Sequence, residues 1–102
     1  MAADVQDNPD LARYEVYEDG ELAGFTEYRR SVGVIALNHT EVEDRFEGRG
    51  LGSALARGVL DAARADSLAV HPYCPFMAGY IRRHPDEYLE LVPADRRAKF
   101  NL

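Results

Sequence analysis

Alternation of apolar with charged residues in the first half of the chain predicts β-strands. Tyr14 and Val16 alternate with charged neighbours, which is typical of a half-buried strand. The pair Asp19-Gly20 follows, and it is a strong signal for a two-residue hairpin turn. A second alternating segment and then a nearly continuous apolar run come next, so the three segments predict an antiparallel meander. The expected strands span residues 12–18, 21–28 and 32–42, with a second turn at 29–31.

Helical spacing replaces alternation in the second half of the chain. Leucine, valine and alanine recur at helical intervals between charged residues, which predicts a helix over residues 51–65. A short strand is expected at residues 67–71, followed by a second helix at 76–83 that Pro85 ends. Residues 88–92 fit either a last strand or a turn of helix. The order β-β-β-α-β-α, with that possible final strand, predicts an α+β, or mixed α/β, fold.

Length and composition favour one domain. A chain of 102 residues, with 46% hydrophobic and 29% charged residues, fits a single globular unit and argues against disorder. The polar residues 1–10 are expected to form a flexible N-terminus, residues 11–95 the domain, and residues 96–102 a C-terminal tail.

Charge and cysteine count exclude several classes of function. A net charge of −6 disfavours a nucleic-acid binder, which needs a basic face. No run approaches the ~20 apolar residues of a membrane span, and the N-terminus lacks the apolar core of a signal peptide. Cys74 is the single cysteine, so no intrachain disulfide forms and a reducing compartment is expected. The sequence therefore predicts a cytoplasmic protein.

The stretch Phe46-Glu47-Gly48-Arg49-Gly50-Leu51-Gly52-Ser53 places three glycines at every second position, just before the first predicted helix. Glycine adopts unusual φ/ψ values and lacks the Cβ that would keep a ligand away from the backbone. The first turn of a helix has N–H groups without intrahelical partners and a partial positive charge, so it binds phosphate oxygens. Arg49 adds a cation to the same turn. The spacing fits neither the dinucleotide fingerprint nor a Walker loop, so the alternatives are a distinct pyrophosphate site and a plain loop.

With these motifs, the chain resembles the GCN5-related N-acetyltransferases (GNATs), and within them a group of very short members. The family signature Arg/Gln-x-x-Gly-x-Gly/Ala lies at a strand-to-helix turn and binds the pyrophosphate of acetyl-CoA. Glu47-Gly48-Arg49-Gly50-Leu51-Gly52 matches its two later glycines, with Glu47 where the family usually has Arg or Gln. His39-Thr40-Glu41-Val42 before this turn, and Cys74-Pro75-Phe76 with Tyr80 to Pro85 after it, look like the short subgroup.

The resemblance spans about residues 12–92 and implies a GNAT-like fold. That fold is an antiparallel meander followed by a glycine-turn helix, a splayed strand and a C-terminal helix. No segment of this sequence is expected to match the pair of N-terminal helices that usually cover the acceptor site, so an open acceptor groove is expected. Acetyl-CoA is the implied cosubstrate. Its implied contacts are Thr40, Val42, Glu47, Gly48, Arg49, Gly50, Leu51, Gly52 and Ser53.

Four side chains are candidates for the transfer chemistry. Tyr80 lies where the family commonly places a tyrosine that protonates the leaving sulfur, and the alternative is a half-buried packing residue. Cys74 follows a strand at a helix start, and the resemblance places it near the thioester; the alternatives are a nucleophile and a small buried hydrophobe. Glu41 and His39 alternate on one strand face, so each is either a general base or a structural side chain.

Two classes of function remain open. The first is an N-acetyltransferase that moves the acetyl group of acetyl-CoA directly to a primary amine in a ternary complex, with a small-molecule or protein amine as acceptor. The second is a non-catalytic CoA-binding or interaction module with the same fold. No metal is expected, because the three histidines and one cysteine lack zinc-ligand spacing. The chain is expected to be a monomer or a weak dimer with no nucleic-acid or membrane partner.

Overall fold

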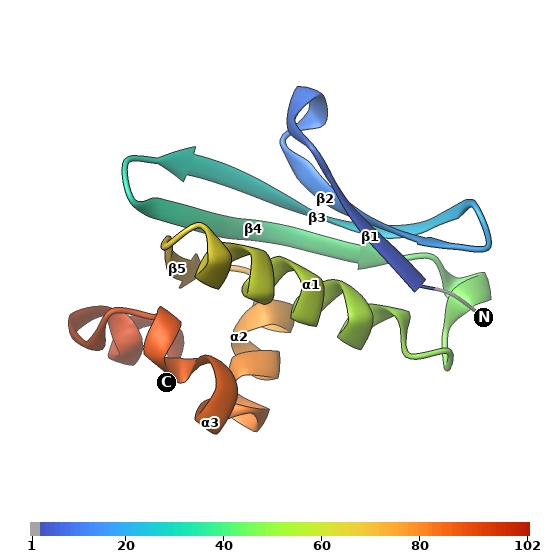
Figure 1. Ribbon diagram of the computed structural model, residues 1–102. Coiled ribbons are helices and arrows are strands. Elements are labelled where there is room, and N and C mark those ends of the chain that lie inside the picture. The colour runs from blue at the N-terminus through green and yellow to red at the C-terminus, as the bar shows by residue number, and fades with distance from the viewer. Residues whose placement is uncertain (1–2) are drawn as a thin grey trace.

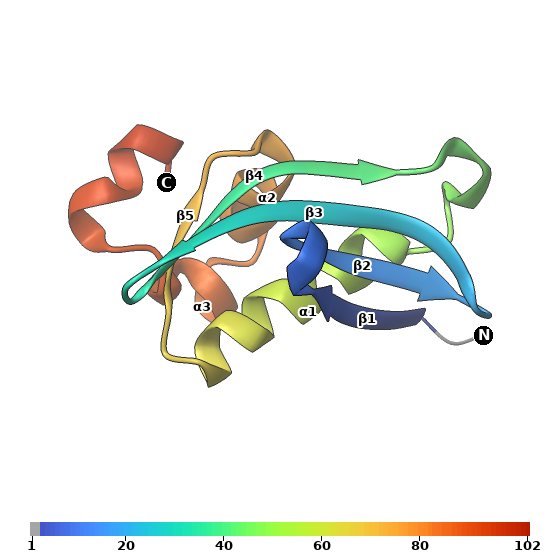
Figure 2. The same cartoon turned by 90° about the horizontal axis from the view of Figure 1, so that it is seen from above.

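A five-stranded sheet with helices against one face makes up the computed structural model, which describes residues 3–102 (Figure 1 and Figure 2). Strands β1 to β4 are antiparallel neighbours in chain order, and β5 pairs with β4 in parallel. This is the α+β fold that the sequence predicts. The strands are β1 (Ala3–Asn8), β2 (Arg13–Glu18), β3 (Glu21–Ser31), β4 (Val34–Val42) and β5 (Ala69–Pro72). The helices are α1 (Leu51–Ala65), α2 (Pro75–Arg83) and α3 (Pro85–Tyr88), and 3₁₀ turns span Pro9–Leu11, Asp44–Phe46, Leu89–Leu91 and Ala94–Phe100.

Two tight turns connect the strands of the meander. Asp19 and Gly20 both have positive φ, 50° and 84°, as a two-residue hairpin turn with the twist of its strands requires, so the predicted first hairpin is confirmed. The predicted second turn at residues 29–31 is wrong, because β3 continues to Ser31. Gly33, with a φ of 73°, makes that turn instead. The polar residues at the end of β3 pair with the apolar start of β4, and their alternation alone did not reveal this.

The N-terminal segment is a strand of the sheet rather than a flexible start. β1 pairs with β2 and places Val5 opposite Val16. Val5 also packs on α1, where a Cβ on Gly58 would lie 2.8 Å from Cγ1 of Val5. A side chain at Gly58 would therefore displace the strand. The expectation of a flexible stretch at 1–10 is corrected for residues 3–8, and residues 1–2 lie outside the described residues.

Helix α1 has the predicted bounds and supplies the centre of the core. Leu55, Val59 and Leu60 are fully buried, at 0% exposure, against the sheet. Ile35 and Leu37 of β4 face them from the sheet and are equally buried. The glycine-rich turn before α1 is thus attached to the best-packed helix of the molecule. Among residues 3–102, no helix is both long and apolar enough to cross a membrane.

The C-terminal segment packs onto the domain. Residues 88–92 were left open between strand and helix; residues 88–91 are helical, and Val92 follows with extended backbone. Phe100 is buried, with 7% of its surface exposed. Arg82 of α2 donates to the carbonyl oxygens of Phe100 and Asn101, at 3.1 and 3.0 Å. The expectation of a separate tail at 96–102 is therefore corrected, because these residues close one end of the core.

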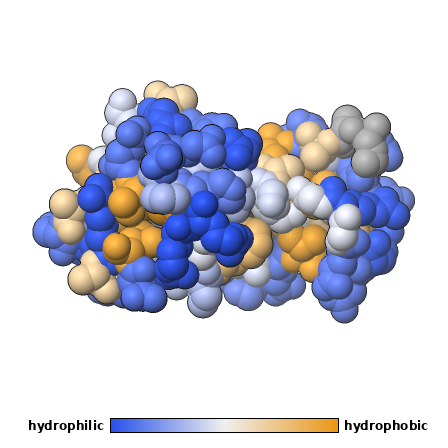
Figure 3. Space-filling model, turned by 90° about the horizontal axis from the view of Figure 1, so that it is seen from below, coloured by the Kyte–Doolittle hydropathy of each residue, from blue (hydrophilic) through white to orange (hydrophobic). Residues whose placement is uncertain are grey.

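All three α-helices lie on the same side of the sheet, and the opposite side has no α-helix over it within the described residues (Figure 1). We call this second side the open face. Strand register places Glu15, Phe25 and Glu41 in one row across it, and Glu27 and His39 in the next. On the helical side, apolar patches are scattered among hydrophilic residues (Figure 3). The open face is therefore the part of the sheet that an incoming molecule reaches most directly.

Candidate active site

The glycine turn has the geometry that an anion site requires. Gly48 and Gly50 have φ values of 82° and 75°, a region that favours glycine, and a Cβ on either would meet nothing within 4 Å. Gly50 is the N-cap of α1, and no side chain caps this helix. The first helical hydrogen bond runs from the N–H of Ala54 to the carbonyl of Gly50. The N–H groups of residues 51–53 therefore have no helical acceptor and are available to a ligand.

The charged side chains of this turn are nearly balanced. The Arg49 guanidinium lies 2.5 Å from a carboxylate oxygen of Glu18, whose side chain is 3% exposed. Arg49 is therefore engaged by a buried carboxylate, although half of its own side chain remains exposed. Glu47 is exposed at the same turn. Any affinity for a phosphate thus depends mainly on the backbone N–H groups. The role of Glu18 as the partner of Arg49 was not predicted from the sequence.

Strand β4 loses its partner β5 halfway along its length. The two strands pair from Val34 opposite Ala69 to Leu37 opposite Pro72. The last contact is a hydrogen bond of 2.9 Å from the N–H of Cys74 to the carbonyl of Leu37. We call this position the splay point. Beyond it, residues 38–42 of β4 pair only with β3, so alternate backbone N–H and C=O groups point away from the sheet and are free for a ligand.

A chain of polar side chains lies on the helical side of the splay point, with Thr26 and Cys74 buried and Thr40 half-buried. The hydroxyl oxygens of Thr26 and Thr40 are 3.0 Å apart, and that of Thr40 is 3.3 Å from the sulfur of Cys74. Cys74 is the N-cap of α2, and its sulfur accepts from the N–H of Met77 at 3.4 Å. The thiol is 3% exposed. Two residues predicted from separate motifs, Cys74 and Thr40, are thus in contact. Thr26, which the sequence did not indicate as a site residue, contacts Thr40 as well.

His39 and Glu41 lie on the open face, on the other side of β4 from Thr40. Their side chains are paired at 2.7 Å, which confirms that they share one strand face. Both are more than half exposed, at 51% and 62%. The ring of His39 also lies near that of Phe25, with centroids 6.2 Å apart. The pair can exchange a proton with a solvent-borne group, but it does not touch the Cys74 thiol.

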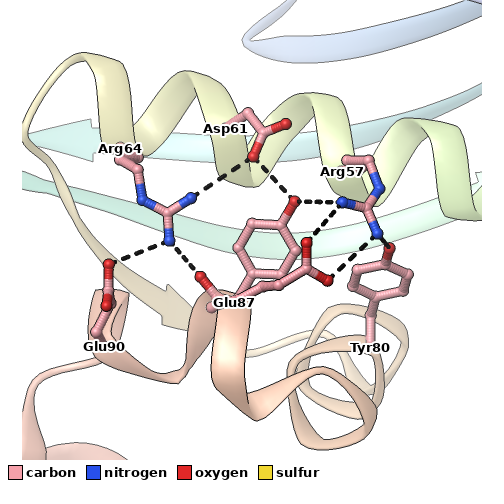
Figure 4. Close-up of polar contacts among 7 residues, drawn as sticks. Arg57, Asp61, Arg64, Tyr80, Glu87 and Glu90 are labelled. Atoms are coloured by element: carbon pink, nitrogen blue, oxygen red, sulfur yellow. Dashed lines mark hydrogen bonds and ion pairs between the residues drawn. The ribbon is translucent and has the colours of Figure 1, made fainter.

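Tyr80 of α2 is buried between α1 and α3, more deeply than the half-buried packing residue that was the alternative to a catalytic role (Figure 4). Its hydroxyl oxygen accepts a hydrogen bond of 3.1 Å from Arg57 of α1. Glu87 binds the same guanidinium with both carboxylate oxygens, at 2.9 and 3.4 Å. The Tyr80 ring also stacks on His84, at 4.2 Å between centroids. From the sequence, Arg57 is only one of the charged residues between the apolar positions of the helix. In the structure, its guanidinium holds the phenol of Tyr80 in place.

Tyr88 completes this network, and its raised pKa predicts that the free energy of unfolding falls at alkaline pH. Its hydroxyl donates to Asp61 at 2.9 Å, and burial followed by this hydrogen bond raises the pKa of Tyr88 to about 12, from 10.0. A raised phenol pKa stabilises the fold fully below pH 10 and loses that contribution as the pH rises towards 12. Urea unfolding between these values should show wild-type stability falling more steeply than that of Tyr88→Phe. Equal slopes would contradict the role of this hydroxyl.

The glycine turn, β4 and α2 meet at one residue. A Cβ on Gly52 would lie 3.0 Å from Cζ of Phe76 and 4.0 Å from Cγ2 of Val42. The backbone of α1 therefore lies closer to the Phe76 ring than a Cβ ordinarily packs, whereas Val42 is at ordinary van der Waals distance. The side chain of Leu51 faces the core, at 2% exposure, so only its backbone is available in the turn. Within residues 3–102, no three His, Cys, Asp or Glu side chains are grouped to hold a metal ion.

The candidate residues therefore fall into three groups. The glycine turn and the free edge of β4 offer backbone groups. Thr40 offers a half-buried hydroxyl, and Cys74 offers a buried thiol. His39 with Glu41, and Tyr80 with Arg57, offer groups that exchange protons on opposite sides of the sheet. A helix start with free N–H groups, beside a strand edge that also has free N–H groups, suits an extended ligand that carries a phosphate.

Comparison with known proteins agrees with this geometry. A family model described as GCN5-related N-acetyl-transferase matches residues 13–91. Protein NATD1 of Gallus gallus and of Homo sapiens are each 36% identical over 58 residues, 56% of this chain and 53% and 51% of those proteins. The chain thus spans about half the length of the curated relatives it matches.

The fold is also that of a solved structure. A GCN5-like putative N-acetyltransferase from Staphylococcus aureus matches with a TM-score of 0.64 and 22% identity, over 88% of this chain and 87% of that one. At this identity the likeness concerns the fold alone. The family model covers most of the chain, including the glycine turn, the splay point and Tyr80. The chain belongs to the GCN5-related N-acetyltransferase family.

Proposed function

We propose that this protein is an N-acetyltransferase that uses acetyl-CoA and transfers its acetyl group to a primary amine. The observation that carries the proposal is the uncapped start of α1, where two left-handed glycines leave open space over three free N–H groups, beside the unpaired edge of β4. Family membership supports the same reaction class. The acceptor amine is left unspecified by all of these features.

The residues of the site fit a coenzyme A molecule. The N–H groups of residues 51–53 would hold the pyrophosphate, because the helix start supplies donors and partial positive charge. Gly48 and Gly50 leave the backbone uncovered there. The free edge of β4 at residues 38–42 would hold the extended pantetheine arm by hydrogen bonds. Bound acetyl-CoA supplies an acetyl thioester that is already activated for attack.

The protein's own residues then supply polarisation and proton transfer. A free N–H of β4 that donates to the thioester carbonyl stabilises the negative charge that develops on its oxygen. The His39–Glu41 pair on the open face would take a proton from the acceptor's ammonium, directly or through water, so that the neutral amine can attack the thioester carbon. The nitrogen would lose its second proton to solvent as the C–N bond forms and the C–S bond breaks. Tyr80 would return a proton to the leaving sulfur. Arg57 donates to the phenol oxygen of Tyr80, so the phenol proton is not engaged in that hydrogen bond and is available for donation to the sulfur.

A non-catalytic CoA-binding module is the second candidate. The observation in its favour is that several reactive groups already have partners. The Cys74 thiol contacts Thr40 and Met77, and the Arg49 guanidinium is bound by Glu18. Such a protein would bind CoA at the same glycine turn without turning it over.

One assay separates the two functions. The full chain is mixed with acetyl-CoA and, in turn, a polyamine, a lysine-containing peptide and a small aromatic amine, and free CoA thiol is measured. CoA binding is measured in parallel by calorimetry. Thiol release that depends on an amine supports the transferase. Binding without release supports the module, and absence of CoA binding overturns both.

A further inference from the structure

A pocket of about 300 Å³ lies between helix α2 and the C-terminal segment. None of its lining residues belongs to the glycine turn or to β4. Its volume is at the lower end of the range of small-molecule sites, about 300–1,000 Å³, so it suits a ligand with a single ring. The proposed acetyl transfer gives this pocket no role.

Two aromatic rings form one wall of the pocket. Tyr73 and Phe100 meet edge to face, with centroids 5.1 Å apart. Phe100 is 7% exposed, whereas Tyr73 is 45% exposed. An exposed ring face next to a fixed one is a surface on which another planar ring can pack.

Two cations border the same pocket. The ammonium of Lys99 lies 5.2 Å from the centre of the Tyr73 ring. Within residues 3–102, none of the ion pairs involves Lys99. The guanidinium of Arg82 is fixed by the carbonyls of Phe100 and Asn101, which are uncharged acceptors. The positive charge at this pocket is thus not neutralised by its own lining.

The cations near this pocket also act on a neighbouring histidine, His71. His71 lies 6.3 Å from the rings of both Tyr73 and Phe100. Burial lowers the pKa of His71, and the charges of Arg96 and Lys99 lower it further, with Asp95 acting in the opposite direction. This end of the molecule is therefore locally positive, although the chain carries a net charge of −6.

We propose that this pocket binds a small aromatic carboxylate. The ring packs against Tyr73 and Phe100, and the carboxylate pairs with Lys99, with Arg82 as the second cation. An aromatic amine, or an apolar ring without a carboxylate, would be bound only through ring packing and would form no ion pair. The carboxylate is thus the group that sets affinity at this site.

Benzoate and benzamide, which differ in charge but hardly in shape, test the proposal. Each is titrated into the full chain and followed by heteronuclear NMR. Benzoate should shift the backbone signals of Tyr73, Ala78 and Lys99 in a saturable way. It should bind about fivefold more tightly than benzamide, the gain expected from one partly exposed ion pair.

Variants locate the charge. Lys99→Gln should reduce the preference for benzoate over benzamide to the remainder that Arg82 supplies, whereas Arg29→Gln, the same loss of charge at an exposed position on β3, should leave it unchanged. Equal binding of the two ligands, an unchanged preference in Lys99→Gln, or shifts confined to other residues would overturn the proposal. No step of this test involves acetyl transfer, so its failure leaves the proposed function untouched.

Discussion

Replacement of Gly50 by valine should weaken CoA binding about tenfold or more, as measured by calorimetry. Gly50 has a φ of 75°, which a β-branched residue adopts only with strain of roughly 1–2 kcal/mol. The new side chain would also enter the open space above the N–H groups of residues 51–53. Both effects move those donors away from a phosphate or cover them.

Gly33→Val is the matched control for this variant. Gly33 has nearly the same φ, 73°, and a Cβ there also meets nothing within 4 Å, but it lies in the turn between β3 and β4. The two variants should therefore lose similar stability in thermal unfolding, and only Gly50→Val should lose CoA affinity. If both bind CoA like the wild type, the glycine turn is not the pyrophosphate site.

Tyr80→Phe should lower kcat of the proposed acetyl transfer by about 10²–10⁴-fold with little change in KM for acetyl-CoA. The substitution removes one hydroxyl from a buried ring and leaves the stack on His84 in place. A loss confined to kcat is expected for a group that acts on the leaving sulfur and does not hold the ground state. Steady-state release of CoA thiol gives both constants.

Tyr88→Phe separates proton donation from packing. Tyr88 is also buried, and its hydroxyl accepts from the same Arg57, at 3.3 Å. Its own proton is donated to Asp61, so the variant should be less stable but should keep kcat. Undiminished kcat in Tyr80→Phe would rule out Tyr80 as the donor.

The parts of the fold that sequence predicted are those set by local pattern. The bounds of α1 follow from apolar residues at helical spacing, and the Asp19-Gly20 turn follows from two positions that tolerate positive φ. β1 was missed because Val5 is the only strongly apolar residue among its six, so only its pairing with β2 defines it. Long-range pairing of this kind leaves no periodic trace in the segment itself.

The candidate site divides in the same way. The glycine turn and the shared face of His39 and Glu41 follow from spacing along a few residues. Glu18, Thr26 and Arg57 were missed because each acts on a residue more than ten positions away in the chain. A helix surface charge such as Arg57 looks solvated in sequence, and only the packing of α1 against α2 and α3 reveals its partners.

The open face has a consequence for selectivity. His39 and Glu41 are more than half exposed on a sheet surface with no α-helix over it in the described part of the chain. Nothing there has to swing aside before an incoming molecule makes contact, and no entrance of fixed width filters molecules by bulk. If the acetyl acceptor binds at this surface, as we propose, its selection rests on charge and hydrogen bonding at the point of contact.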